Sequence, residues 1–252
     1  MSTSTTTPPP DTAGTPVRSH FPAMLTKQVV FGGFCWLLTL TFFAGQIIVQ
    51  SQMSTPYSLD TNDVSDLGVT TCGSVTVFTY HATVCSPLHT VMNGTFIVTG
   101  LLFLLGIIGT RCAWPRRLLT IWGLAFLALA GPGEVLAGLM PENVNPGLHI
   151  FGGLLGIPGA SIGLLLLGTA IWRGQRWVGI FSLLSGTVGL FGFFVAPSIG
   201  LAAGIAERIA SYPTDVWMMV LGGFLLWCAV RSRSKGMPLQ TQLLNDGGDT
   251  GS

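Results

Sequence analysis

The chain of 252 residues is 49% hydrophobic and only 8% charged, whereas roughly 25% of the residues of a soluble domain are charged. This composition excludes an ordinary soluble domain, and together with 34 glycines it is typical of a polytopic helical membrane protein. The 11 basic residues are scattered along the chain, so no feature indicates binding to nucleic acid.

Six apolar stretches are long enough to cross a membrane, because the hydrocarbon core of a bilayer needs about 20 apolar residues per helix. They predict an all-α fold, a single six-helix transmembrane domain over residues 28–231. The first stretch is longer than the apolar region of a signal peptide, so we expect it to be retained. Residues 1–27 open with a Ser-, Thr- and Pro-rich segment and residues 232–252 are largely polar, which predicts disordered tails. The predicted spans are about 28–50, 87–110, 118–138, 148–172, 177–199 and 213–230.

Basic residues gather in one set of the connections between these spans. Lys and Arg resist translocation and collect on the cytoplasmic side of a membrane. We therefore predict a multi-pass protein of the cell membrane with both termini in the cytoplasm and with residues 51–86, 139–147 and 200–212 outside. Arg208 is the one basic residue of this outer set. The others are Arg18, Lys27, Arg111, Arg116, Arg117, Arg173, Arg176, Arg231, Arg233 and Lys235.

The longest predicted outer loop, residues 51–86, contains the only pair of cysteines on that side, Cys72 and Cys85. We predict a disulfide between them, which would contribute about 3 kcal/mol in the chain-entropy model. The alternative is two free thiols whose separation does not allow a bridge. Alternation of small polar and apolar residues over 74–80 also predicts a short strand in this loop.

Polar side chains recur near the outer ends of the predicted helices. Glu134 is the strongest candidate, because a carboxylate inside a span is costly and usually marks a site or a buried pair. Pro132, just before it, interrupts the helical hydrogen bonds. The outer ends converge by topology, so we predict one polar ligand-binding pocket without metal or cofactor. Its candidate residues are Asp66, His89, Asn93, Glu134, His149, Glu207 and Arg208.

Each candidate also has a purely structural interpretation. A His at the start of a span, such as His89 or His149, is often an interfacial residue that contacts headgroups and water. Glu207 and Arg208 form an ion pair in this interpretation, whereas in the predicted pocket Arg208 pairs with a carboxylate. Asp66 is then an acidic residue that caps a turn.

Four short motifs lie near the outer ends of the predicted spans. They are VSDLG at 64–68, SPLH at 86–89 followed by Asn93, LMP at 139–141 followed by His149, and Glu207–Arg208. Together they resemble the membrane family labelled DUF998, a domain of unknown function, over about residues 28–231. This resemblance implies a mostly prokaryotic six-helix membrane protein with no established reaction. In layout the chain is distantly similar to the DRAM/Sfk group of six-span proteins, which are associated with lipid distribution and autophagy.

Three functions fit these features. We favour a protein that binds or organises membrane lipid, or supports a membrane protein partner, through the polar pocket. The second is an intramembrane lipid hydrolase that uses His89 and His149 with Asp66 or Glu134, although no HExxH or GxSxG motif is present. The third is a small-molecule transporter, against which the absence of charge from the inner halves of the spans argues.

Overall fold

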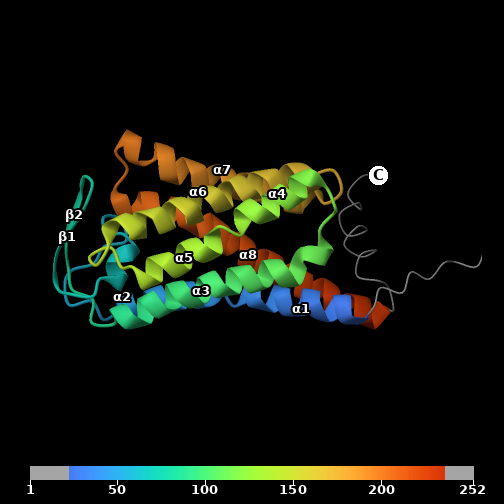
Figure 1. The fold of residues 1–252 in the computed structure, drawn as a ribbon, viewed down its shortest axis with the longest axis horizontal. Coiled ribbons are helices and arrows are strands. Elements are labelled where there is room, and N and C mark those ends of the chain that lie inside the picture. Colours follow the sequence, from blue (N-terminus) through green and yellow to red (C-terminus); the bar gives the residue numbers. More distant parts are fainter. Residues whose placement is uncertain (1–22, 236–252) are drawn as a thin grey trace, which may run out of the picture.

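The computed structural model describes residues 23–235, which form an elongated helical bundle (Figure 1). Six of its helical segments are long and apolar enough to cross a membrane, so the chain is an all-α, multi-pass membrane bundle, as its composition predicts. The predicted tails lie largely outside the described residues, 1–22 and 236–252 being beyond them. The spans are Lys27–Gln50, His89–Ala113, Leu118–Leu139, Pro146–Ile171, Arg176–Val195 and Ala203–Arg231.

Three of the spans are interrupted helices, which is why the structure has more helices than crossings. The first divides at Leu38–Thr39, where the Thr39 hydroxyl donates to the Trp36 carbonyl at 2.7 Å. The third divides at Ala128–Leu129, shortly before Pro132. The fifth ends in a π-helix. The helices are α1 (Ala23–Leu37), α2 (Leu40–Gln50), α3 (His89–Thr110), α4 (Leu118–Leu127), α5 (Ala130–Leu139), α6 (Pro146–Ile171), α7 (Arg176–Leu190), the π-helix η3 (Phe191–Val195) and α8 (Ala203–Lys235), with short 3₁₀ turns η1 (Ser65–Gly68), η2 (Arg111–Ala113) and η4 (Pro197–Ile199).

The last helix begins earlier than its apolar pattern predicts. Residues 200–212 were predicted to form a loop, but α8 begins at Ala203 and passes through Pro213. The prediction was wrong because it treated Glu207 and Arg208 as loop residues and Pro213 as a helix start. Both polar side chains are instead satisfied by the segment that follows α2, so a helix can carry them at this depth.

Close approaches between glycines hold the helices together. A Cβ added at these positions would lie against the backbone of the neighbouring helix, so only glycine permits the observed spacing. In this way α5 packs on both α3 and α6, and α1 packs on both α3 and α8. The facing pairs are Gly32 with Gly109, Gly33 with Gly222, Gly100 with Gly131, Gly123 with Gly163 and Gly133 with Gly152.

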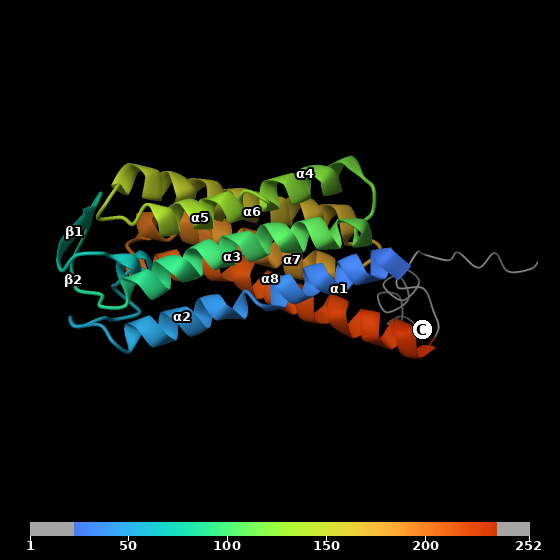
Figure 2. The ribbon, with the colours of Figure 1, turned by 60° about the horizontal axis from the view of Figure 1, so that its bottom comes forward.

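A β-hairpin covers one end of the bundle, which we call the hairpin end (Figure 2). Strands β1 (Gly73–Val77) and β2 (Tyr80–Val84) pair antiparallel, with Gly73 opposite Val84 and Val77 opposite Tyr80. The predicted single strand over 74–80 is therefore one arm of a hairpin plus its turn. The predicted disulfide is present between Cys72 and Cys85, whose Cα atoms are 4.2 Å apart.

The described ends of the chain, the start of α1 and the end of α8, lie together at the other end of the molecule, which we call the chain-end side (Figures 1 and 2). A large apolar cluster fills this part of the bundle. Trp36 and Trp217 are fully buried in it, with ring centroids 5.5 Å apart, and Trp114 packs on both. The tryptophans leave the bundle well packed on this side.

Candidate functional site

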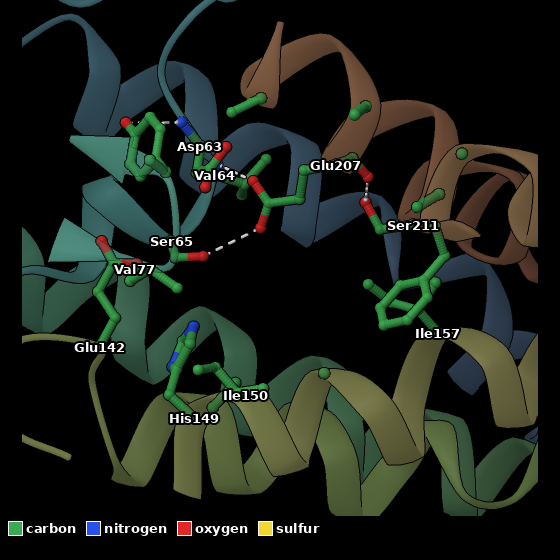
Figure 3. A pocket seen from close by; sticks show the side chains of 18 of the residues that line it. Asp63, Val64, Ser65, Val77, Glu142, His149, Ile150, Ile157, Glu207 and Ser211 are labelled. Carbon is green, nitrogen blue, oxygen red and sulfur yellow. Dashed lines mark hydrogen bonds between the residues drawn. The ribbon is translucent and has the colours of Figure 1, made fainter. Parts of the chain in front are cut away.

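A cavity of about 740 Å³ opens among the helices at the hairpin end (Figure 3). The first halves of α6 and α8, the end of α5 and the π-helix η3 form its walls. The segment around residues 61–65 and the turn of the β-hairpin cover it. Pockets that bind small molecules in proteins measure about 300–1,000 Å³, so this one is large enough for a ligand.

The cavity exists because α6 and the end of α7 separate. The two helices are in close contact where Gly189 faces the Ser161 side chain. Beyond this point Gly192 packs against α8 at Ala210, while Gly152 packs against α5. Because each helix follows a different neighbour, a gap forms between α6 and η3. A Cβ added at Gly153, which lines this gap, would meet nothing within 4 Å.

The membrane-facing part of the cavity is apolar. Ile150 and Ile157 line it from α6, and Phe193 and Pro197 line it from the opposite wall. Large side chains beside the gap, such as Phe194, are more than half exposed on the surface of the bundle. These apolar side chains lie within a candidate span, so this side of the bundle suits contact with lipid.

The part nearest the hairpin is polar and acidic. Glu207 lies on one side of the open space and His149 on the other (Figure 3). The carboxyl-bearing residues that line the cavity are Asp63, Glu134, Glu142 and Glu207.

Glu207 holds the covering segment in place. Its carboxylate accepts hydrogen bonds from the Val64 backbone amide and from the Ser65 hydroxyl, the latter at 3.0 Å. Both donors belong to the VSDLG motif, so this motif and Glu207 form one structural unit across the cavity mouth.

Arg208 points away from the cavity into the same covering segment. Its guanidinium donates to the backbone carbonyls of Leu59 and Asn62 at 3.0 and 2.8 Å, and to the Tyr57 hydroxyl at 2.7 Å. A fourth bond goes to the Gly204 carbonyl at 2.9 Å. The prediction that Arg208 pairs with a carboxylate was wrong, because the planar guanidinium finds its acceptors in carbonyls of the segment.

Asp66 is fully buried but does not line the cavity. Its carboxylate accepts hydrogen bonds from the Asn62 amide at 2.8 Å and from the Tyr80 hydroxyl. Asp66 also helps to raise the pKa of Glu142. Its hydrogen bonds tie the segment after α2 to the hairpin.

Two of the carboxyls that line the cavity, Asp63 and Glu142, lie outside the spans and have raised pKa values. Burial raises the pKa of Glu142 to about 10, with further contributions from Asp66, Glu207 and Asp63. Burial likewise raises the pKa of Asp63 to about 8, assisted by the negative charges of Glu207 and Asp66 and opposed by Arg208. Burial and the neighbouring acidic groups therefore favour the protonated forms of both carboxyls.

Of His89, His149 and Asn93, only His149 lines the cavity, and each of the three lies within hydrogen-bond distance of a backbone carbonyl. His149 lines the cavity, and its Nδ1 lies 3.0 Å from the Met140 carbonyl. His89 lies outside the lining, with Nδ1 2.9 Å from the Ser86 carbonyl. Asn93 donates to the Gly68 carbonyl at 2.9 Å. Of the seven candidates, Glu134, His149 and Glu207 line the cavity, and Asp66, His89, Asn93 and Arg208 do not.

Asp63 and Glu142 were not among the candidates, although each adjoins a motif that the sequence contains. Asp63 immediately precedes VSDLG, and Glu142 follows the LMP motif before His149. The buried Asp215 of α8 was also overlooked as a candidate. Within residues 23–235, no three His, Cys, Asp or Glu side chains are arranged to hold one metal ion.

Comparison with known proteins places the chain in a family. No curated protein matches it, and no solved structure does. The similarity to the DRAM/Sfk group is not shown. The model of the family described as "Protein of unknown function (DUF998)" matches residues 37–223, which include both VSDLG and every carboxyl of the cavity. The chain therefore belongs to the DUF998 family of membrane proteins.

Proposed function

We propose that this protein binds an amphiphilic membrane lipid in the cavity at the hairpin end. The acyl chain occupies the gap between α6 and η3, and the headgroup lies among the polar side chains beneath the hairpin. One observation carries the proposal: a single cavity is lined by apolar side chains of α6 and η3 in one part and by acidic side chains beneath the hairpin in another.

The headgroup supplies the selectivity of such a site. Burying a CH₂ group away from water is worth about 0.8 kcal/mol, but an acyl chain that leaves a bilayer was already out of water. The apolar gap therefore admits any chain with little preference. The polar groups therefore distinguish one lipid from another. The covering segment and the hairpin shield these groups from bulk solvent.

We infer that the hairpin end faces the outside of the cell membrane and that both termini are cytoplasmic. The basic residues Lys27, Arg111 and Arg173 belong to connections on the other side, and the disulfide suits an oxidising compartment. Cysteines introduced singly on a cysteine-free background test this assignment. A membrane-impermeant reagent should label position 60 and spare position 115, and labelling of 115 from outside would reverse the orientation.

The alternatives receive less support. A hydrolase built on His89 and His149 would need both rings at one site, whereas only His149 lines the cavity. A transporter would need a continuous path, whereas the well-packed tryptophan cluster occupies the chain-end side.

Replacement of Gly153 by Trp tests the lipid-binding proposal, because the new side chain would fill the gap. Gly94→Trp is the matched control, since Gly94 also has nothing within 4 Å and does not line the cavity. Native mass spectrometry of protein released from native-lipid nanodiscs should show bound lipid on the parent and on Gly94→Trp but not on Gly153→Trp. Equal lipid retention by both variants would refute the proposal.

A further inference from the structure

We infer that the headgroup bound in this cavity carries a cationic amine, with N–H groups that donate to the acidic side chains beneath the hairpin. The inference rests on the proposed lipid-binding function and specifies its ligand class. It concerns Asp63, Glu134 and Glu142, since Glu207 already has hydrogen-bond donors within the protein.

The first observation is an imbalance of charge at the polar end. Four carboxyls line the cavity, and no Lys or Arg does so in the described part of the chain. The nearby cation, Arg208, directs its donors to backbone carbonyls and to Tyr57. A negatively charged headgroup would meet acidic groups without a neutralising partner there, whereas a positively charged one would be attracted.

The second observation is a set of acceptors without donors. Glu142 is only 3% exposed, and its Oε1 has no hydrogen-bond donor among residues 23–235. Asp63 Oδ1 and Glu134 Oε2 are likewise buried and unpartnered within that range.

The spacing of these groups favours an organic cation over a metal ion. They come from three separate parts of the chain, the covering segment, α5 and the connection before α6, and meet at the wall of one cavity. In the described residues they do not converge as ligands of one metal. An ammonium group carries three N–H donors and needs no converging set of ligands, so one or two of these carboxyls can hold it.

Binding of a cation should release protons. Glu142 faces Asp66, Asp63 and Glu207, and Asp63 faces Glu207, Asp66 and Arg208. With the cavity empty, burial keeps the pKa of Asp63 at about 8 and that of Glu142 at about 10. A bound ammonium favours their ionised forms, so the proton lost from each carboxyl goes to solvent. Affinity for the cation should therefore increase as the pH rises toward about 8.

The test compares three amphiphiles that share one chain: dodecylammonium, dodecanol and dodecyl phosphate, each titrated into nanodisc-embedded protein. Empty nanodiscs provide the background. We expect dodecylammonium to bind at least about ten-fold more tightly than the other two, with affinity rising between about pH 6 and about pH 8 as Asp63 ionises. Glu142→Gln should remove about ten-fold of that preference. Asp60→Asn, at an exposed acid of the same loop outside the cavity lining, is the matched control and should change nothing.

The outcomes separate the two proposals. Equal binding of all three probes, lost in Gly153→Trp, would overturn the cationic headgroup and leave lipid binding standing. Saturable binding of no probe, or binding that Gly153→Trp does not affect, would overturn both. If Glu142→Gln does not yield folded protein, Asp63→Asn replaces it, and an unchanged preference in that variant overturns the inference.

Discussion

The two ends of the bundle are packed in opposite ways. On the chain-end side, tryptophans and facing glycines leave the helices in close contact around a large apolar cluster. At the hairpin end, the helices separate around a cavity, and a segment held by Glu207, Arg208 and a disulfide covers it. The contrast indicates that the chain-end side provides rigidity, whereas the hairpin end keeps polar groups available for a ligand.

The largest effect on stability is expected on the chain-end side. Trp217 is fully buried, stacks on Trp114, makes an edge contact with Trp36 and donates from Nε1 to the Ser182 hydroxyl at 2.8 Å. Trp217→Ala should lower the free energy of unfolding by about 3–5 kcal/mol, the usual range for removing a large buried aromatic side chain. Thermal unfolding in detergent measures the change. Trp122→Ala is the control, because that side chain is 54% exposed; a comparable loss in both would contradict the contrast between filled core and lipid-facing surface.

The disulfide should be the strongest single constraint on the hairpin end. Cys72 and Cys85 are 13 residues apart, so in the chain-entropy model their bridge contributes about 3 kcal/mol to the stability of the hairpin. Cys72→Ser should therefore speed hydrogen exchange in β1 and β2 while leaving α1 and α8 unaffected. Cys112→Ser, at a free thiol, should leave both regions as they are. Non-reducing mass spectrometry that found both cysteines free would remove the basis of this prediction.

Arg208 should stabilise the covering segment through geometry as well as charge. Its planar fork reaches two carbonyls and the Tyr57 hydroxyl, which a lysine ammonium cannot reproduce. Arg208→Lys should cost about 2 kcal/mol locally, within the range for hydrogen bonds to charged groups. Faster hydrogen exchange over residues 57–64 would report the loss. Arg173→Lys, at an exposed position, should have no effect; if exchange over 57–64 stayed unchanged in Arg208→Lys, the segment would be held by other contacts.

The smallest expected effect is a pH dependence confined to the hairpin end. The pKa values of Asp63 and Glu142 are higher in the folded protein, about 8 and about 10, than in an unfolded chain. Between the pKa of each group in the unfolded chain and its pKa in the folded protein, the folded state binds more protons. Its stability is therefore greatest at acidic pH and falls as the pH rises through about 8.

Thermal unfolding of ligand-free protein at a series of pH values measures this dependence. Glu142→Gln should reduce the slope, because the amide cannot ionise, whereas Asp60→Asn should not. A slope that is the same in all three proteins would mean that these carboxyls do not control the hairpin end.

Some of the cavity could be predicted from the sequence. Glu134 is a candidate because burying a carboxylate in an apolar span is costly and usually marks a site or a buried pair. His149 and Glu207 are candidates because they lie near helix ends beside recognisable motifs. His89, Asn93 and Arg208 lie at similar depth, yet they bond to backbone carbonyls outside the cavity. Depth along a helix follows from residue number, but the direction of a side chain depends on how the helix is rotated in the bundle.

The sequence by itself determined the six crossings and the disulfide, because both follow from local quantities: the length of an apolar run, and two cysteines in one short loop. It also determined which glycines were available for helix contacts. Only the tertiary structure decided where α8 begins and which carboxyls share a cavity. The polar start of α8 is stable because the segment after α2 supplies partners for Glu207 and Arg208. The cavity, in turn, results from α6 and η3 packing on different neighbours, a competition between contacts that are distant in the chain.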